Sequence, residues 1–445
     1  MKERVYRDPV HGSIPFDRDD EAYIIELIDT AEFQRLRRIK QLGAAFLVFH
    51  GAEHTRFTHS IGVAHLAKKM LRKLESDPHL PRDLPFDQTK KQVMAGALLH
   101  DIGHGPFSHL FERVFEHKKH EEWGMEIIDS QNTEVHSVLQ KHNLVDSVKE
   151  VLQPRFRPRF PRDIISSQLD ADRLDYLLRD SYMTGVAYGR YDLDWLLGVI
   201  ELARIPANGK DLGLAINLAK GQHVAEQFVI GRHLMYQQVY FHKTIRSAEL
   251  MVKLVFERLR RNAAKNTYPK HCPPPLRCLI DPDLRKMNLD AYLKLDDAFM
   301  LTCFNVWSNE EGEDDVLKDI AKRLIKRNLF KTALIDTSKN KDTVKFARAM
   351  QKLNTAISEA GFDPDYYLAS DTAEDLPYKD MSWYVSKEKR PEDIWLAENG
   401  EGKKTLSDVS PLVASIINEA MTTSRICFPK ELRTIVFQHL HAYLS

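Results

Sequence analysis

The string LLHDIGHG at residues 98–105 places an imidazole directly beside a carboxylate, at His100 and Asp101. An apolar helical pattern leads into this pair, and the glycines and proline of GHGP stop it immediately afterwards. Adjacent helical residues point about 100° apart, so both side chains can address one ion only near the end of a helix. An imidazole nitrogen and a carboxylate oxygen together suit a first-row transition metal. A single His-Asp pair is more often a surface dipeptide, so this one needs further support.

Two distant segments offer donors of the same kind. In HTRFTHS, His59 opens a helical pattern, and in DADRLDY several carboxylates, among them Asp172, lie between apolar neighbours. Uncompensated charge is unfavourable in such surroundings, so a metal or a partner cation is expected there. Each segment alone fits a capped helix end or a solvated charge. Taken in this order, the segments predict a metal centre with positions left for water and substrate, held by His59, His100, Asp101 and Asp172.

Further histidines and one acid surround the His-Asp pair. His104 lies four residues after His100, and Glu112 lies three residues after His109, so each pair is expected to share a helical face. His120 begins another helical pattern. Imidazole titrates near neutral pH, which makes these side chains candidates for proton transfer. Each histidine fits equally well the role of a buried residue hydrogen-bonded to the backbone.

Arginines are the third chemical feature of these segments. Phosphate groups are bound by fixed cations, and the planar fork of arginine is the preferred one. Arg56, Arg173 and Arg232 lie within or near the segments that carry the ligands. The denser basic run at residues 35–40 is typical of a solvated helix face.

Composition limits the other classes of function. The chain has 445 residues, and its 64 lysines and arginines balance its 64 aspartates and glutamates, so no net charge requires a nucleic acid or a membrane as partner. The four cysteines form no CxxC pair, which argues against zinc fingers and a disulfide framework. The N-terminus lacks the apolar core of a signal peptide, and no apolar run is long enough to span a bilayer. We therefore expect a cytoplasmic protein.

The patterning that must position these residues is mainly helical. Thirteen of the nineteen histidines lie in residues 1–142, so the chemistry is expected in the first part of the chain. A short extended segment at residues 1–16 precedes helical patterns around 20–40, 59–75, 90–102, 121–130, 165–180 and 222–262. Prolines at 269 and 273–275 indicate a boundary. We predict a mainly α protein with a helical catalytic core at 1–265 and a smaller α+β region at 266–445. That region has helices at 316–329 and 343–359 and strands at Lys331–Asp336 and Tyr366–Ala369.

The order of these motifs resembles the HD-domain superfamily. The fuller strings resemble its dNTP triphosphohydrolases related to the SAM-and-HD-domain protein, in a short form without the SAM domain. The matching strings are DPVHG (8–12), IDTAEFQRLRRIKQLG (28–43), HTRFTHSIGVAHLA (54–67), ALLHDIGHGPFSHLFE (97–112), HE (120–121), LDADRLDYLLRDSYMTGV (169–186) and YFHK (240–243). Together they extend over roughly the first 260 residues, in the order found in the family.

The resemblance implies hydrolysis of a dNTP to a deoxynucleoside and triphosphate, with a divalent ion such as Mn, Fe, Zn, Ni or Mg bound by the four ligands. It assigns His104, Glu112 and His120 to the catalytic group and His109 to protonation of the leaving 5′ oxygen. It assigns the triphosphate to Arg56, Arg173, Tyr176 and Arg232, and the sugar to Gln41, Leu42, Asp180 and Tyr240. It further implies a regulatory guanine nucleotide at Asp29, Gln34 and Arg37 and a homo-oligomer, dimeric or tetrameric.

Departures from the family pattern affect two parts of the implied site. Glu112 stands where an aspartate is usual, so the carboxylate–imidazole pair has a longer side chain. Tyr236 and Phe241 replace a histidine and a glutamine near the base, which leaves the base preference open. Two alternatives also stay open: another HD-type nucleotide phosphohydrolase or phosphodiesterase, and a nucleotide-binding regulator without activity. The complete ligand set argues against the second alternative.

Overall fold

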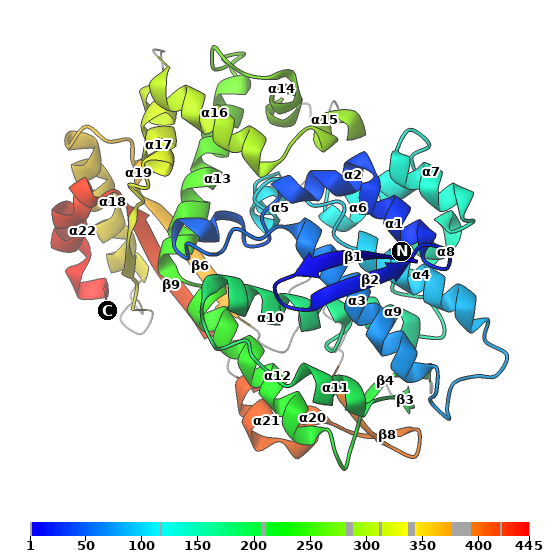
Figure 1. The fold of residues 1–445 in the computed structure, drawn as a ribbon. Helices are drawn as coiled ribbons and strands as arrows, with labels where there is room; N and C mark the ends of the chain where they lie inside the picture. Colours follow the sequence, from blue (N-terminus) through cyan, green and yellow to red (C-terminus); the bar gives the residue numbers. More distant parts are fainter. Residues whose placement is uncertain are drawn as a thin grey trace.

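The computed structural model describes residues 2–115, 118–205, 211–281, 288–310, 314–336, 343–375, 393–418 and 421–444. Most of these residues are helical, which confirms the mainly α class predicted from the sequence (Figure 1). Among the residues described, no helix is both long enough and apolar enough to cross a membrane.

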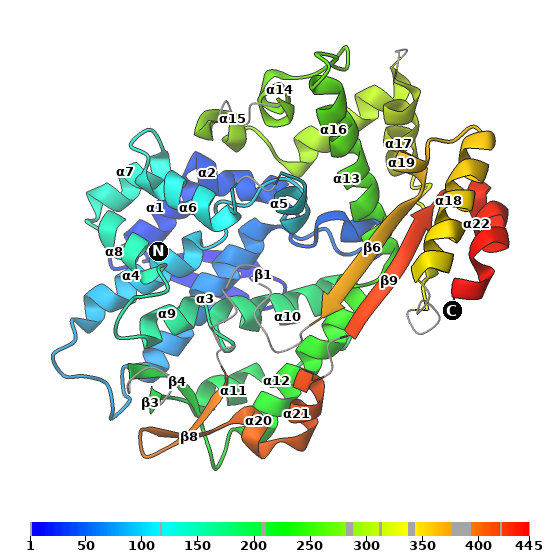
Figure 2. The same ribbon diagram turned by 180° about the vertical axis from the view of Figure 1, so that it is seen from behind.

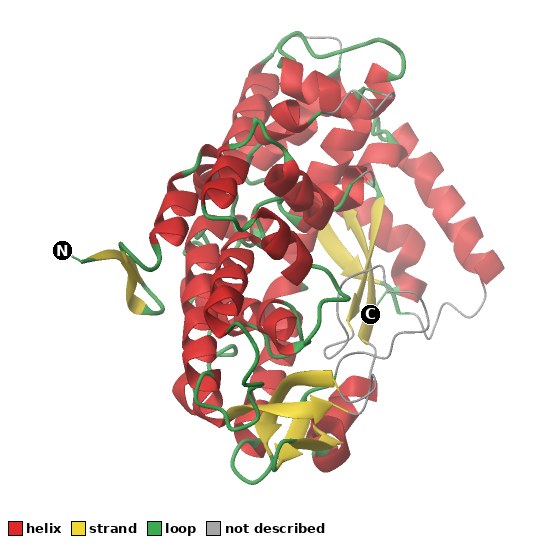
Figure 3. Cartoon of the chain, turned by 90° about the vertical axis from the view of Figure 1, so that its right-hand side faces the viewer, coloured by secondary structure: helices red, strands yellow, loops and turns green. Residues whose placement is uncertain are grey.

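The N-terminal segment is an antiparallel hairpin of β1 (Glu3–Asp8) and β2 (Gly12–Asp17). Asp8 shapes its turn, because one carboxylate oxygen accepts the backbone N–H groups of Val10 and His11, each at 2.9 Å. Gly12 closes the turn with a φ of +71°, a left-handed conformation that glycine adopts without strain. The hairpin lies at one edge of the helical body (Figure 3).

The first hydrophobic core surrounds α3 (Arg56–Leu74), α4 (Phe86–Leu99) and α10 (Ala171–Thr184), which pack against one another. Helix α3 is buried on almost every face, so its apolar residues do not form a single stripe. Other elements around this core are α1 (Ala22–Asp29), α2 (Ala31–Arg35), η1 (Leu36–Arg38), η2 (Gly43–Leu47), α7 (Glu134–Lys141), α8 (Val145–Val151), α9 (Phe160–Ile165), α11 (Leu193–Val199), α12 (Gln222–Met235) and the π-helical turn η3 (Tyr236–Tyr240).

A second core lies behind the first and surrounds α13 (Lys243–Ala263) (Figure 2). Its antiparallel sheet has the order β5 (Lys331–Leu334), β9 (Met421–Phe428), β6 (Ala369–Asp375). Its helical elements are α14 (Pro274–Ile280), α15 (Leu289–Leu293), α16 (Asp297–Asn309), α17 (Asp315–Ile325), α18 (Thr343–Glu359), α19 (Pro364–Tyr367), η5 (Lys430–Leu432), α22 (Arg433–Leu440) and η6 (His441–Tyr443). Two short helices, α5 (His109–Phe115) and α6 (His120–Asp129), lie between the cores, and Leu110 and Phe111 of α5 are buried in the second one.

The chain then returns to the first core. Strands β3 (Ile200–Ile205) and β4 (Asp211–Asn217) close into a small barrel with β7 (Trp395–Glu398) and β8 (Glu401–Thr405). Helices α20 (Leu406–Val409) and α21 (Pro411–Asn418) follow and pack on α12. The boundary predicted at residue 265 therefore does not separate the two cores. Helix α13, which precedes it, belongs to the second core, and the segment from β7 to α21, which follows it, packs in the first.

One strand prediction was wrong. Residues 366–369 were expected to be extended, but Tyr366 and Tyr367 belong to α19, and β6 begins only at Ala369. Asp363 accepts the backbone N–H of Asp365, and Pro364 stands at the first helical position. These two features start a helical turn that the aromatic pair alone does not predict.

Candidate metal and proton-transfer site

Three helix ends carry the predicted metal ligands. His59 lies in the first turn of α3, His100 caps the end of α4 at the point where an apolar helix was predicted to stop, and Asp172 lies in the first turn of α10. Asp170 begins α10 by accepting the backbone N–H of Arg173 at 2.6 Å. The three ligands therefore stand on elements that the first core holds rigidly.

The structure brings His59, His100 and Asp172 together, and we call these three residues the metal group. Asp172 Oδ1 lies 3.0 Å from His59 Nε2 and 3.7 Å from His100 Nε2, and the three ligand atoms all lie within 4.8 Å of one another. The two imidazole planes meet at 75°, so a single point can lie in both planes. The Asp172 side chain is 30% exposed, which leaves the group open to solvent on that side.

Asp101, the fourth predicted ligand, lies against this group and is shared with other side chains. Its Oδ1 is 3.4 Å from His100 Nε2 and 3.2 Å from His104 Nε2. Its Oδ2 is 3.6 Å from His59 Nε2 and also accepts a hydrogen bond from Arg56. Asp101 thus links the metal group to the second histidine group described below.

The two imidazoles are oriented by their far nitrogens. His59 Nδ1 lies 2.8 Å from Asp175 Oδ2, and His100 Nδ1 lies 2.8 Å from the carbonyl oxygen of Ala97. A proton on each Nδ1 satisfies these acceptors and leaves a lone pair on each Nε2. Both Nε2 atoms are buried and make no hydrogen bond within the described ranges. Buried imidazole lone pairs that face a carboxylate fit a divalent metal ion.

Negative charge dominates around these nitrogens. Burial alone would lower the pKa of His59, but the nearby carboxylates of Asp172 and Asp175 outweigh burial and raise its pKa to about 10. The pKa of His100 is also raised, because Asp101 and Asp172 more than offset burial. Burial opposes ionisation of Asp172, yet the two imidazoles hold its pKa well below the usual range. The group therefore attracts a cation, whether a proton or a metal.

A second group gathers around one oxygen of Glu112. Glu112 Oε1 lies 2.7 Å from His120 Nδ1, 3.6 Å from His104 Nδ1 and 3.8 Å from His109 Nδ1. The His109–Glu112 pair shares the face of α5, as predicted. The helical face predicted for His100 and His104 does not form, because α4 ends at Leu99 and a turn follows. His104 reaches the group from that turn and not from a helix.

By distance alone, this second group could also hold a metal. Its ring geometry argues against that role. His104 and His120 stack with centroids 3.9 Å apart and planes only 13° apart, so an ion in the plane of one ring lies out of the plane of the other. Imidazole binds a metal through an in-plane lone pair, and the stacked pair therefore suits proton transfer better than joint ligation.

The pKa shifts divide the second group into two kinds of residue. Burial and the nearby Arg56 guanidinium hold the pKa of His104 well below its ordinary value. Burial also disfavours the charged form of His120, but the Glu112 carboxylate outweighs burial and raises the pKa of His120. Burial opposes ionisation of Glu112, and the hydrogen bond with His120 reverses that effect and lowers its pKa. His104 is therefore neutral and Glu112 is ionised, whereas His120, the hydrogen-bond partner of Glu112, favours its own protonated form.

The turn that carries His104 is held by Arg35 of α2 and by residues of the second core. Arg35 donates to the carbonyl oxygen of His104 at 2.8 Å, and the Tyr292 hydroxyl donates to that of Gly103 at 2.5 Å. Asp297 accepts the backbone N–H of Phe107 at 2.6 Å and that of Lys40 at 2.9 Å. A Cβ atom on Gly103 would lie 2.0 Å from the carbonyl oxygen of His120, so only glycine lets the turn approach α6 this closely.

The predicted phosphate-binding side chains lie on α3, α10 and α12, and the structure gives them partners within the protein. Arg56 donates to Asp101 and, at 2.9 Å, to Ser108 Oγ. Arg173 donates to Asp170, and Arg232 donates to Gln168 Oε1 at 2.8 Å. The Tyr176 ring lies edge-on to the Tyr240 ring, with centroids 6.3 Å apart.

Two of the four side chains predicted to bind the sugar, Asp180 and Tyr240, are hydrogen-bonded to each other. Asp180 accepts the Tyr240 hydroxyl at 2.8 Å, and its other oxygen lies 2.7 Å from His54 Nε2. Gln41 Oε1 is buried without a hydrogen bond from any described group, as expected of an acceptor reserved for a ligand. Leu42 packs beside Val48 and Phe49 at the edge of a small apolar cluster.

The residues assigned to regulation lie near one another at the surface. Asp29 pairs with both terminal nitrogens of Arg4, and Gln34 accepts from Arg37 Nε at 2.8 Å. The Arg37 guanidinium lies 3.5 Å from the centroid of the Phe57 ring. A bound base would need to compete with these internal contacts.

Sequence reasoning missed three residues of the site: Asp175, His54 and Asp297. The signal for Asp175 was its spacing of three residues from Asp172 on one helical face.

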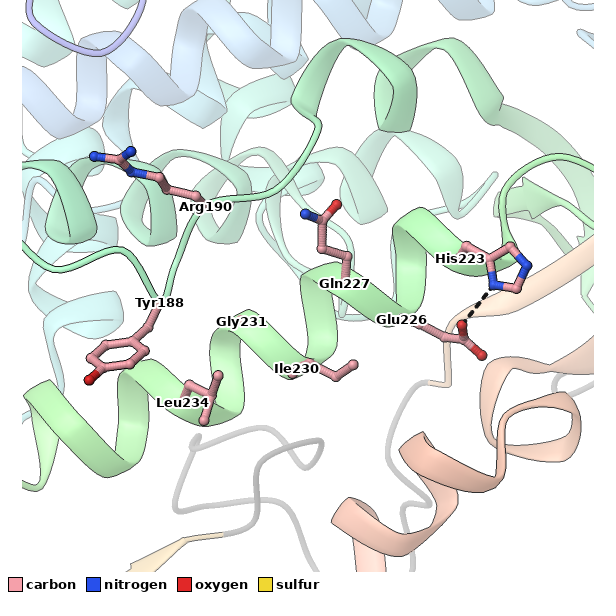
Figure 4. Close-up of a pocket in the computed structure, with 8 residues that line it drawn as sticks. All are labelled: Tyr188, Arg190, His223, Glu226, Gln227, Ile230, Gly231 and Leu234. Atoms are coloured by element: carbon pink, nitrogen blue, oxygen red, sulfur yellow. Dashed lines mark hydrogen bonds and ion pairs between the residues drawn. The ribbon is translucent and has the colours of Figure 1, made fainter.

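A shallow groove along α12 lies apart from the site. Figure 4 shows Tyr188 and Arg190 of the segment after α10 facing α12, whose His223 pairs with Glu226 at 3.0 Å. No predicted site residue lines this groove.

Known proteins resemble this chain in sequence and in fold. The model of the HD domain family matches residues 56–180, the range that contains the metal group and the second histidine group. The uncharacterized protein YwfO of Bacillus subtilis is 38% identical over 433 residues, which cover 97% of this chain and 93% of that protein. The deoxynucleoside triphosphate triphosphohydrolase SAMHD1 of Mus musculus is 31% identical over 297 residues, 57% of this chain and 44% of that protein. The crystal structure of a phosphohydrolase from Bacteroides thetaiotaomicron aligns with a TM-score of 0.79 at 27% identity, covering 96% of this chain and 100% of that one. The chain belongs to the HD-domain superfamily and is related to its dNTP triphosphohydrolases.

Proposed function

We propose that this protein is a metal-dependent hydrolase that converts dNTPs to deoxynucleosides and triphosphate. One observation carries the proposal: two buried imidazole nitrogens face the partly exposed Asp172, and Asp101 connects them to the stacked His104–His120 pair. A cation site beside a proton-transfer group is the arrangement that metal-assisted hydrolysis requires. The relationship to named dNTP triphosphohydrolases supports the choice of substrate.

His59, His100, Asp101 and Asp172 would hold the divalent ion (Mn, Fe, Zn, Ni or Mg), which acts as a Lewis acid on the α-phosphate and on water. The remaining steps fall to the protein. Neutral His104 and ionised Glu112 can accept a proton as water attacks, and His120 favours the protonated state. His109 has a side chain that is 63% exposed, so it can reach a substrate and protonate the 5′ oxygen as it leaves.

Binding of the triphosphate and of the sugar is proposed for separate side chains. Arg56, Arg173 and Arg232 would supply positive charge to the triphosphate, and Tyr176, whose ring contacts that of Tyr240, would join them. Asp180 and Gln41 would engage the 3′-hydroxyl, while the Tyr240 ring and Leu42 leave no room for a 2′-hydroxyl. Ribonucleotides should therefore be poor substrates. Tyr240→Ala should raise ribonucleotide hydrolysis relative to deoxyribonucleotide hydrolysis.

A guanine nucleotide is proposed as an activator at Asp29, Gln34 and Arg37, acting on a homo-oligomer. An aspartate can accept from the N1–H and N2–H edge of guanine, and an arginine can donate to O6. GTP or dGTP at low concentration should accelerate hydrolysis of the other dNTPs and increase the molecular mass seen by light scattering. Indifference in both assays would reject this regulation and leave the hydrolase proposal standing.

The decisive experiment incubates metal-loaded protein with each dNTP, alone and in mixtures, and identifies the phosphate product. Inorganic triphosphate and deoxynucleoside are the expected products. Pyrophosphate plus a monophosphate, or orthophosphate, would point to another type of nucleotide phosphohydrolase. Tight nucleotide binding without turnover, with every metal supplied, would favour a non-catalytic regulator.

A further inference from the structure

The N-terminal turn DPVHG has no part in the chemistry proposed above, yet its side chains reach the metal group. His11 is buried, with 3% of its side chain exposed, and its Nε2 lies 2.7 Å from Asp175 Oδ1. The other oxygen of the same carboxylate lies 2.8 Å from His59 Nδ1. We infer that the turn of the β1–β2 hairpin positions the metal ligand His59, with Asp175 as the connecting carboxylate.

Asp175 is fully buried and accepts four hydrogen bonds. His59 and Arg179 Nε donate to Oδ2, the latter at 2.7 Å, and His11 and Arg179 Nη2 donate to Oδ1, the latter at 2.8 Å. Each oxygen therefore has two donors, and the plane of the carboxylate is fixed from both sides. Because that plane sets the direction in which His59 Nδ1 must point, it also sets where His59 Nε2 points.

Arg179 ties the same carboxylate to the hairpin a second time. Its Nη1 donates to Asp8 Oδ2 at 2.7 Å, while Asp8 Oδ1 holds the backbone of the turn. The hairpin thus reaches Asp175 by two routes, directly through His11 and indirectly through Asp8 and Arg179. Two contacts at different atoms restrain rotation of the carboxylate more than one contact would.

Close packing of α3 on α10 leaves no space between Gly62 and the side chains of this network. A Cβ atom on Gly62 would lie 2.0 Å from Asp175 Oδ1 and 2.4 Å from Arg179 Nη2. A glycine one turn after His59 therefore lets the network fit directly against the helix that carries the ligand. The hairpin, α3 and α10 meet at a single carboxylate.

This inference rests on the proposed metal role of His59 and concerns the affinity of the site. Groups that orient a metal-bound histidine typically contribute about 10–100-fold in metal affinity. Loss of His11 leaves the His59–Asp175 hydrogen bond in place but removes one of the two donors to Oδ1, so the carboxylate is restrained less. We therefore expect weaker metal binding in His11→Ala, although residue 11 lies 48 positions before His59 and outside the range that matches the HD domain model.

The test measures metal binding directly in the full-length protein. Co²⁺ is titrated into the metal-stripped protein, followed by its visible absorption, and dissociation constants come from competition with a chelator. Asp175→Asn and His11→Ala should each weaken Co²⁺ binding by about 10–100-fold. His11→Gln, whose side-chain N–H groups can still donate, should recover part of the loss. The matched control is His65→Ala, which removes a histidine whose ring centroid lies 5.5 Å from that of His11 and which makes no described hydrogen bond to Asp175.

Thermal unfolding of the metal-stripped variants separates positioning from folding. Unchanged Co²⁺ affinity in folded His11→Ala and Asp175→Asn would overturn the inference, as would an equal loss in His65→Ala. If Asp175→Asn does not fold, His11→Ala and His11→Gln decide the question. Failure of the wild-type protein to bind any divalent metal would instead overturn the proposed function.

Discussion

The two histidine groups differ in what holds them. His59, His100 and Asp172 stand at the ends of long helices that share the first core. His104, Glu112 and His120 stand on a turn, on a short helix and at the first residue of another helix, and the turn is tied to the second core. The first group therefore depends on helix packing within one core, whereas the second also depends on contacts with the second core.

The groups also differ in ring geometry and in charge. The imidazoles of the first group cross at 75°, while those of His104 and His120 are nearly parallel at 13°. Carboxylates raise the pKa of both imidazoles in the first group, but in the second group the pKa of His104 is lowered and that of His120 is raised. Similar residue types thus form a candidate cation site in one place and, in the other, a stacked pair whose pKa values are shifted in opposite directions. Residue identity alone therefore does not distinguish candidate metal ligands from candidate proton carriers.

The largest expected effect comes from removing a ligand of the first group. Asp172→Ala deletes the carboxylate that faces both Nε2 atoms, so bound metal and activity should be lost together. The Lewis-acid contribution of a metal is several kcal/mol, so turnover should fall at least ~1000-fold. Metal content by elemental analysis and triphosphate release measure the two effects. Retention of both in a folded Asp172→Ala protein would remove this residue from the metal site.

Removing a member of the second group should lower turnover without loss of bound metal. His120→Ala deletes the stacked imidazole that favours its protonated form beside ionised Glu112, and general acid–base catalysis typically contributes about 100–10,000-fold. We expect turnover to fall within that range while metal content stays at the wild-type level. Glu112→Gln keeps the size of the side chain and should act in the same direction, because a neutral amide no longer favours the protonated His120. Loss of metal from His120→Ala would mean that the stacked group ligates an ion after all.

The sequence reveals the first group better than the second for a physical reason. Each ligand of the first group lies at a helix end that is visible as a change from an apolar pattern to glycine, proline or a capping residue. The predicted patterns around 59–75 and 90–102 therefore correspond to α3 and α4 to within a few residues. Whether the four predicted residues bind metal stays a prediction that the experiments above address.

Contacts between distant segments have no such local signal. Asp175 resembles any acid on the buried face of a helix, and its partner His11 lies 164 positions away. The strands β3 and β4 were missed; they pair with each other, and their barrel is completed by β7 and β8, almost two hundred residues later. The shared face predicted for His100 and His104 was wrong because two glycines end the helix first. The Asp175–His11 contact is thus decided by tertiary structure, whereas the end of α4 is decided by local sequence.

The smallest expected effect concerns Asp297, which joins the second core to the turn of the second group. Burial raises the pKa of Asp297 to about 6, although the backbone N–H groups of Phe107 and Lys40 partly oppose that shift. In the unfolded chain the pKa of an aspartate is about 3.9, so the folded protein binds more protons between these two values. Stability from this group is therefore fully present below about pH 4 and is lost as the pH rises through about 6.

Asp297→Asn isolates this contribution, because the amide does not titrate. The free energy of unfolding of wild type relative to Asp297→Asn should fall by about 2–3 kcal/mol between pH 4 and pH 7, since one pKa unit corresponds to about 1.4 kcal/mol. Urea unfolding of both proteins at several pH values measures the difference, and effects of all other titrating groups cancel in the comparison. A difference that is constant with pH would show that Asp297 keeps an ordinary pKa in the folded protein. Metal content should be the same in both proteins, because Asp297 contacts the turn of the second group and none of the ligands of the first.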